Sequence, residues 1–119
     1  IQEADAVMVA RGDLGQNIPI EKVPFVQSDL ISRCRNIDRT VIVATQMMLS
    51  MTNNTEPTRA EVTDVAEAIL EGADCVMLSE ETASGKFPVE SVAIMEKIVL
   101  EAEKHLKGKI ILNPLERVL

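Results

Sequence analysis

Three short runs of consecutive apolar residues divide the chain, at Ala6–Ala10, Val41–Ala44 and Cys75–Leu78. Consecutive apolar residues, in contrast to alternating ones, are typical of strands that are covered on both faces, as in a parallel sheet. The runs end 34 residues apart in both cases, which is close to the length of one strand–helix unit of a barrel. A helical repeat such as the tetratricopeptide has the same period but contains no buried strands.

The segment after the second run has the pattern of an amphipathic helix. Thr58 and Glu61 have the spacing of a capping box, in which each side chain binds the backbone N–H of the other residue. Gly72 is placed to end the helix, because glycine readily adopts the left-handed conformation that follows a last helical turn. We therefore predict a helix that begins near Arg59. Its apolar stripe consists of Val62, Val65, Ala66, Ile69 and Leu70.

The segments after the first and third runs also predict helices. Pro88 suits the first turn of the last helix, and Gly108 is placed near its end. The apolar face of this helix consists of Val92, Met95, Val99, Ala102 and Leu106. The helix after the first run is less regular and has Val23, Val26, Leu30 and Cys34 on its apolar face.

Alternation of buried strands with helices predicts an α/β fold of parallel strand–helix units with right-handed connections. With 119 residues the chain is only about half of a (β/α)8 (TIM) barrel, which needs roughly 250. The chain begins at Ile1 with no methionine and no basic leader, so we expect it to be cut from a longer, cytoplasmic protein. Cys34 and Cys75 have no C-x-x-C spacing and are expected to be buried thiols in a reducing compartment.

Charge and composition exclude several classes of partner and site. The net charge of −7 argues against nucleic acid and anionic membrane surfaces as partners, and no apolar run approaches the roughly 18 residues of a membrane span. His105 is the sole histidine, and Phe25 and Phe87 are the only aromatic residues. Histidine triads, histidine-rich zinc sites and aromatic base-stacking platforms are therefore excluded. The chemistry has to come from carboxylates, hydroxyls and the backbone.

Polar residues follow each apolar run, and in a parallel barrel these strand ends would meet at one mouth, where active sites lie. Asp13 is a hard oxygen ligand suited to Mg²⁺, and Gly12 lets a ligand approach the backbone closely. A short helix starting after Asp13 would add N–H groups that favour a carboxylate or phosphate. The three polar groups are Arg11-Gly12-Asp13, Thr45-Gln46 and Ser79-Glu80-Glu81-Thr82.

A purely structural interpretation of these residues is also open. Asp13 could cap the short helix, Gly12 could supply a turn, and Arg11 could pair with an acidic side chain. Thr45 could donate its hydroxyl to an anionic ligand, although a threonine at a strand end also serves as a turn residue. Ser79 has the same two interpretations, and the functional one is weaker.

Four blocks of the sequence stand out, namely Met8–Gly15, Val43–Met47, Pro57–Glu61 with Asp64–Ala66, and Gly72–Ser79 with Glu81–Ala83. In this order and at this spacing they resemble the pyruvate kinase family over about residues 4–106. The resemblance implies that residues 1–107 are the last three strand–helix units of the catalytic (β/α)8 barrel. Residues 108–119 would connect toward a C-terminal domain that this chain lacks. It also implies the reaction, in which the phosphoryl group of phosphoenolpyruvate passes to ADP to give pyruvate and ATP in glycolysis.

The resemblance implies a role for each matching residue. Asp13 would be one of two carboxylates that bind the catalytic Mg²⁺. The backbone N–H groups of Gly12 and Asp13 and the hydroxyl of Thr45 would contact the phosphoenolpyruvate carboxylate. Ser79 would help to deliver a proton to the enolpyruvate carbon. Arg59 would lie at the contact between barrels of a homo-oligomer, expected to be a tetramer.

Other parts of the family's machinery are expected outside this chain. They are the lysine that stabilises the transferring phosphoryl group, the second Mg²⁺ carboxylate, the K⁺ ligands and most nucleotide contacts. One departure from the family's sequence lies inside this chain, where Glu80 stands in place of the usual glycine. The shape of this loop therefore does not follow from the resemblance. The half-site is expected to bind weakly and to catalyse nothing detectable.

Two other functions compete with the kinase interpretation. A metal-dependent aldolase or lyase on a related barrel would also use an acid-bound metal, but the block Pro57–Glu61 is associated with the kinases alone. A non-catalytic module could keep the barrel surface for assembly, and the pair Asp13 and Thr45 argues against this for the longer protein.

The isolated chain is expected to be unstable, because three strands leave two sheet edges with unpaired N–H and C=O groups. The side chains expected to point into the barrel, where the missing strands would cover them, are Val7, Val9, Ile42 and Val76.

Overall fold

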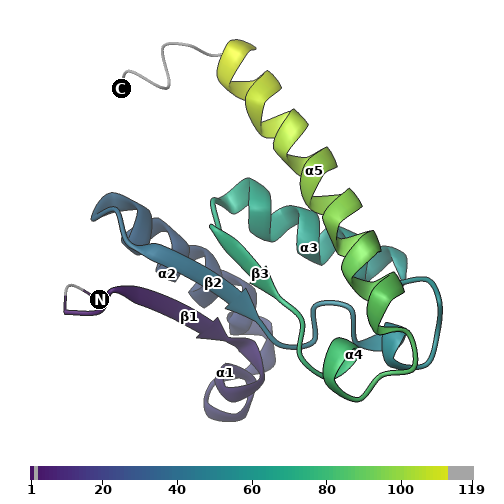
Figure 1. Cartoon of the computed structure of the whole chain (residues 1–119). Coiled ribbons are helices and arrows are strands. Elements are labelled where there is room, and N and C mark those ends of the chain that lie inside the picture. The colour runs from purple at the N-terminus through teal and green to yellow at the C-terminus, as the bar shows by residue number, and fades with distance from the viewer. Residues whose placement is uncertain (2, 113–119) are drawn as a thin grey trace.

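The computed structural model describes residue 1 and residues 3–112, with side chains described as far as residue 106. Helices and strands alternate along this part of the chain (Figure 1). In chain order they are β1 (Ala6–Ala10), α1 (Arg11–Asn17), η1 (Ile20–Lys22), α2 (Val23–Asn36), β2 (Thr40–Ala44), η2 (Leu49–Thr52), α3 (Arg59–Glu71), β3 (Cys75–Met77), α4 (Glu80–Ala83) and α5 (Pro88–Leu112), where η marks a 3-10 helix.

The three strands form one parallel sheet in the order β1-β2-β3. Val9 of β1 is the register partner of Val43 in β2, which in turn is the partner of Val76 in β3. The predicted parallel strand–helix units are thus confirmed. In Figure 1, α2 and α3 lie behind the sheet, α1 lies beyond the C-terminal end of β1, and α5 packs against α3 and extends past it.

The hydrophobic core lies between the sheet and the helices. Val9, Val41 and Val43 of the sheet are buried in it. The helices contribute Ile31, Cys34, Val65, Ala68, Met95 and Ile98, and three buried methionines, Met47, Met48 and Met51, come from the connection after β2.

The opposite face of the sheet is open. Met8 is 48% exposed, and its register partner Ile42 is only half-buried. The expectation that Val7, Val9 and Val76 point away from the helices is therefore wrong, since all three pack in or against the core. Side chains of a strand alternate between faces, so in an all-apolar run a shift of one residue exchanges the faces without changing the pattern.

The ends of α3 are as predicted. The Thr58 hydroxyl accepts the Glu61 N–H at 3.1 Å, and the Glu61 carboxylate accepts the Thr58 N–H at 2.8 Å, which completes the capping box. Gly72 follows the helix in the left-handed region, with φ 112°. These local signals are reliable because each concerns neighbours within one turn.

Two local expectations are wrong. The last helix does not end near Gly108 but runs to Leu112, because one internal glycine costs a helix only about 1 kcal/mol relative to alanine. Cys75 is exposed, since it lies on the open face of β3, an edge strand of this sheet. The expected boundary between residues 107 and 108 falls within α5 and stays a prediction, while residues 113–119 of the connection lie outside the described residues.

No helix in the described part of the chain combines the length and apolarity of a membrane span.

Candidate functional site

The three polar groups predicted from the sequence lie at one edge of the sheet. Parallel pairing places the carboxyl ends of β1, β2 and β3 together, and Asp13, Thr45 and Ser79 each follow one of these ends. The prediction that the three residues lie at the same end of three adjacent strands is confirmed.

Asp13 lies in the first turn of α1, because this helix begins at Arg11 directly after β1 and not after Asp13 as expected. The side chain of Asp13 is exposed, and its carboxylate has no hydrogen bond or ion pair among the described residues. Its carbonyl accepts the Asn17 amide at 2.7 Å, which holds the C-terminal turn of the helix. The carboxylate is therefore free for a ligand, and it does not cap α1.

Thr45 has an unusual backbone. Its φ is 72°, and Gln46 follows with φ 56°, so both residues lie in the left-handed region. This region is unfavourable for non-glycine residues and most of all for β-branched ones, at a cost of about 1–3 kcal/mol each. The surrounding structure has to hold this turn in place, which is typical of functional sites.

The Thr45 hydroxyl accepts the backbone N–H of Gly12 at 2.8 Å. Two groups that were expected to bind the same substrate carboxylate thus bind each other here. No acceptor for the hydroxyl proton of Thr45 lies among the described residues, so this proton remains able to bind an anion.

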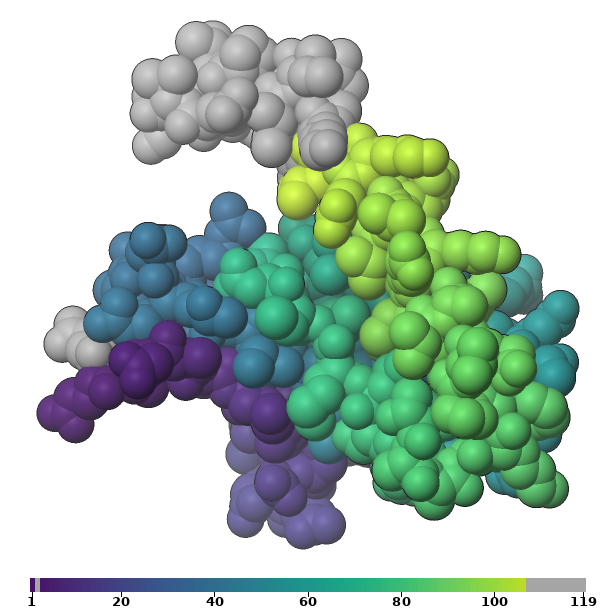
Figure 2. All heavy atoms as spheres, viewed as in Figure 1, coloured from purple at the N-terminus to yellow at the C-terminus, as the bar shows by residue number. Residues whose placement is uncertain are grey.

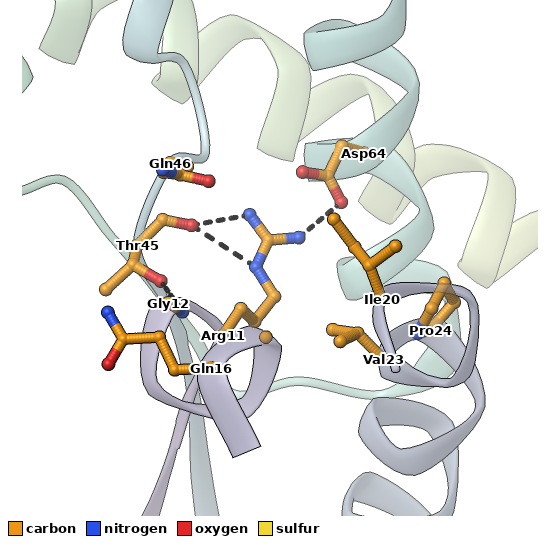
Figure 3. Close-up of a pocket in the computed structure, with 10 residues that line it drawn as sticks. Arg11, Gly12, Gln16, Ile20, Val23, Pro24, Thr45, Gln46 and Asp64 are labelled. Atoms are coloured by element: carbon orange, nitrogen blue, oxygen red, sulfur yellow. Dashed lines mark hydrogen bonds and ion pairs between the residues drawn. The ribbon is translucent and has the colours of Figure 1, made fainter. Parts of the chain in front are cut away.

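Arg11, the first residue of α1, holds the turn at Thr45 by hydrogen bonds from its side chain (Figure 3). Its Nη2 donates to the Thr45 carbonyl at 2.7 Å, and its Nε donates to the carbonyls of Thr45 and Ala44, both at 3.3 Å. Its Nη1 forms an ion pair with Asp64 of α3 at 2.6 Å. The arginine side chain is only 14% exposed, so the Asp64 carboxylate balances a largely buried charge.

Two cavities are lined by predicted site residues. The larger, of about 460 Å³, lies on the helix side of the sheet and includes Arg11, Gly12, Thr45 and Asp64 in its lining. Asp13 instead lines a cavity of about 190 Å³ beside β1, together with Met8 and Leu30. Ser79 lines neither cavity. The larger cavity is therefore not where the predicted site residues meet, because it excludes both the Asp13 and the Ser79 side chains.

Ser79 is held by Glu81, a residue that the sequence analysis named in the polar group after the third run but gave no role. The Glu81 side chain is 1% exposed, and its carboxylate accepts the Ser79 N–H at 3.0 Å and the Met48 N–H at 2.9 Å. It thus joins the connection after β3 to the connection after β2. Glu80 is exposed and begins α4, where its negative charge suits the N-terminal turn of a helix.

A second carboxylate stabilises the connection after β2. Glu61 accepts hydrogen bonds from the backbone N–H and the hydroxyl of Ser50 in η2 as well as from Thr58. Burial acts to raise the pKa of Glu61, but the hydrogen bonds from Ser50 and Thr58 outweigh it and hold this pKa below its usual value of 4.5. The ionised carboxylate therefore ties η2 to the start of α3.

Comparison with known proteins decides the family. A family model of the pyruvate kinase barrel domain matches residues 1–92. The chain belongs to the pyruvate kinase family. The pyruvate kinase of Leishmania mexicana is 54% identical over 118 residues, which are 99% of this chain and 24% of that protein. The pyruvate kinase of Eimeria tenella is 57% identical over 103 residues, which are 87% of this chain and 19% of that protein.

A solved structure agrees with this assignment. The crystal structure of a pyruvate kinase from Cryptosporidium parvum matches with a TM-score of 0.86 and 51% identity. The match covers 87% of this chain and 21% of that one. The chain thus spans about a quarter or less of the length of these relatives. Family membership argues against the aldolase or lyase alternative.

The residues of this pyruvate kinase segment fit Mg²⁺ in part. Asp13 supplies an exposed carboxylate without a partner among the described residues, which suits a metal that takes one or two carboxylates and completes its shell with other oxygens. The described residues contain no group of three or more His, Cys, Asp or Glu side chains able to hold a metal. Asp13 can therefore be one ligand of a site that needs further ligands.

Arg59 is exposed at the first position of α3. No hydrogen bond or ion pair of its side chain occurs within the described residues, so it stays available for an interface. Arg11 and Asp64 are functional candidates that the sequence only hinted at, because the acid that pairs with Arg11 lies 53 residues away.

Proposed function

We propose that this chain is the last three strand–helix units of the catalytic barrel of a pyruvate kinase. The full-length enzyme transfers the phosphoryl group of phosphoenolpyruvate to ADP, giving pyruvate and ATP in the glycolysis of the cytoplasm. The observation that supports this most directly is the cluster of Gly12, Asp13 and Thr45 at the carboxyl ends of parallel strands in a chain of this family.

Thr45 and the first turn of α1 bind the substrate carboxylate in this proposal. The Thr45 hydroxyl donates its free proton, and the Asp13 N–H is one of the first-turn amides that have no partner within a helix. The Gly12 N–H can join them only if it leaves the Thr45 oxygen, or it can fix that hydroxyl while the other two groups bind. In the second case the hydroxyl stays fixed when the anion binds, and fixed donors need little reorganisation during the reaction.

Asp13 would be one ligand of Mg²⁺, which when bound neutralises charge on the phosphoryl oxygens during transfer. The second carboxylate, the phosphoryl-binding lysine, the K⁺ ligands and most of the ADP site belong to other parts of the enzyme. Ser79 would hold its hydroxyl near the carbon that is protonated to form pyruvate, with its backbone fixed by Glu81. Arg59 would contact a neighbouring barrel in a homotetramer.

A segment exchange tests the proposal directly. The matching segment of the Leishmania mexicana enzyme would be replaced by this chain, and pyruvate formation measured at varied Mg²⁺ and phosphoenolpyruvate. We expect the hybrid to be active, Asp13→Ala to remove most of its activity, and Thr45→Ala chiefly to raise KM for phosphoenolpyruvate. Loss of one hydrogen bond to a charged group costs about 1.5–3 kcal/mol.

Arg33→Ala is a suitable control, because Arg33 pairs only with Asp29 on the exposed surface of α2 among the described residues. Its activity should equal that of the hybrid. A soluble, folded hybrid without activity, or an Asp13→Ala variant with normal turnover at limiting Mg²⁺, would refute the proposed function.

A further inference from the structure

We infer that Arg11 and Asp64 are positioning residues that hold the Thr45 hydroxyl in its substrate-binding orientation. The inference rests on the proposed function, since it assumes that Thr45 binds the phosphoenolpyruvate carboxylate. Neither residue touches the substrate in this account, and both act through the backbone of Thr45.

The conformation of Thr45 requires support from outside the turn. Two successive non-glycine residues have positive φ, 72° at Thr45 and 56° at Gln46. A peptide with such angles relaxes to the extended or right-handed region unless contacts prevent it. Relaxation would rotate the Thr45 side chain away from Gly12 and from the mouth of the site.

Arg11 supplies contacts that oppose this relaxation. Its guanidinium donates to the carbonyls on both sides of the Ala44–Thr45 junction, so the plane of the guanidinium fixes two successive peptide groups. Arginine suits this task because its N–H groups form a rigid, planar fork, whereas a lysine ammonium is a point charge on a flexible stem. The adjacent residue Gly12 then holds the Thr45 hydroxyl itself at 2.8 Å.

Asp64 orients the guanidinium group of Arg11. It lies on α3, whose start is fixed by the capping box, and its Oδ1 lies 2.6 Å from Arg11 Nη1. The Asp64 side chain is 34% exposed and that of Arg11 is 14% exposed, so water screens this pair less than a surface pair. Figure 3 shows the chain of contacts from Asp64 through Arg11 to the Thr45 carbonyl, and from the Thr45 hydroxyl to Gly12.

The alternative is that the ion pair only stabilises the packing of α3 against the β1–α1 junction. A purely stabilising pair would change the thermal midpoint and the amount of folded enzyme. It would leave KM for phosphoenolpyruvate unchanged in the molecules that remain folded. Positioning of a binding group predicts the opposite pattern, in which substrate binding weakens and the chemical step is affected little.

The experiment uses the full-length kinase with Asp64→Asn, Asp64→Ala, Arg11→Lys and Thr45→Ala. We expect Asp64→Ala and Arg11→Lys to raise KM for phosphoenolpyruvate about tenfold, with kcat and KM for ADP within about twofold of the wild type. Asp64→Asn keeps an acceptor for Arg11 and should have a smaller effect. Arg11→Lys keeps the charge opposite Asp64, so its thermal midpoint should stay near that of the wild type although its KM rises.

A double variant distinguishes an effect of Asp64 on KM that acts through Thr45 from an effect that is independent of Thr45. If Asp64 acts through the Thr45 hydroxyl, adding Asp64→Ala to Thr45→Ala should raise KM by less than about twofold, whereas independent effects would multiply. Glu67→Ala is the matched control, because it removes the same charge from the same helix. Glu67 makes no hydrogen bond or ion pair with Arg11 in the described chain.

The outcomes test the positioning inference and the proposed kinase function separately. An active wild-type enzyme whose KM rises in Thr45→Ala but not in folded Asp64→Ala and Arg11→Lys would overturn the inference and leave the proposed function standing. Fully multiplicative effects in the double variant would also overturn it. An active enzyme whose Thr45→Ala variant has an unchanged KM would overturn the inference and the role of Thr45 but not the kinase activity. A folded wild-type enzyme that forms no pyruvate would overturn both.

Discussion

Gly72 joins α3 to the segment that leads into β3, and its backbone has a conformation that other residues resist. Its φ is 112°, and a Cβ added there would lie 2.0 Å from Nη1 of Arg35 on α2. We expect Gly72→Ala to destabilise the segment by about 1–2 kcal/mol, because an L-residue pays this cost in the left-handed region. The thermal midpoint of the full-length enzyme, followed by circular dichroism, measures the effect.

Two further variants identify the cause. Arg35 is exposed and can move away, so the double variant Gly72→Ala with Arg35→Ala should remain as unstable as Gly72→Ala alone. A double variant with normal stability would show that the clash and not the backbone is responsible. Gly15→Ala is the control, since a Cβ at this position meets nothing within 4 Å.

At the residue scale, the position of the site could be predicted from the sequence better than the contacts between the residues within the site. Asp13, Thr45 and Ser79 could be found because each follows an apolar run, and topology alone places strand ends together. Asp64 and Glu81 could not be assigned from the pattern. An acidic residue in an amphipathic segment is usually solvated, and only the three-dimensional structure brings Asp64 to Arg11 and buries Glu81.

Among the elements, η2 and the start of α3 depend on one ionised side chain. The Glu61 carboxylate accepts hydrogen bonds from Ser50 and Thr58, and its pKa lies below 4.5 in the folded protein. A group with a depressed folded pKa contributes stability at pH values above its unfolded pKa. This stability is lost as the pH falls through the folded pKa.

We therefore expect Glu61→Gln to lower stability by about 1 kcal/mol at pH 7, in the range of a lost helix cap. The difference between variant and wild type should shrink as the pH falls below 4.5, since the wild type then loses the same charge. Thermal midpoints between pH 7 and the acid limit of the folded enzyme test this. Glu67→Gln is the control, because Glu67 lies outside the capping box. Its stability difference from the wild type should not shrink as the pH falls. A constant difference across the whole range would contradict the role of the Glu61 charge.

The elements also show which sequence signals are sufficient to predict the end of a helix or the buried face of a strand. The capping box of Thr58 and Glu61 and the stop at Gly72 are local, so they fixed α3 at both ends. Gly108 failed as a stop signal because a single glycine is a weak penalty within a long helix. The faces of β1 and β3 could not be assigned, since consecutive apolar residues carry no alternation and the helices that decide the matter are distant in sequence.

At the scale of the whole molecule, one face of the sheet has no cover. Met8 is 48% exposed, Cys75 is exposed and Ile42 is half-buried, and all three share this face through the strand register. In Figure 2 the purple atoms of β1 are open to view along the surface of the molecule. A complete barrel would cover this face with the side chains of strands from across its interior.

We expect the isolated 119-residue chain to self-associate or to bind ANS, and to form no pyruvate from phosphoenolpyruvate and ADP. The exposed face and the outer edges of β1 and β3 both favour association with other chains. Analytical ultracentrifugation and thermal unfolding measure this. A monomer with a sharp two-state transition would contradict it, as would Mg²⁺-dependent turnover above background.

Met8→Lys tests the same idea by giving opposite results in two contexts. In the isolated chain a lysine on the open face is solvated, so we expect less self-association and less ANS binding. In the full-length enzyme this position would lie in the barrel interior, where an unpaired charge is costly, and the variant should lose folded protein and activity. Ser32→Lys is the control, because Ser32 is exposed on α2, on the helix side of the sheet, and its substitution should be tolerated in both contexts. If Met8→Lys were tolerated in the full-length enzyme, this face could not be the interior of a barrel, and the assignment of the chain to the last three barrel units would have to be abandoned.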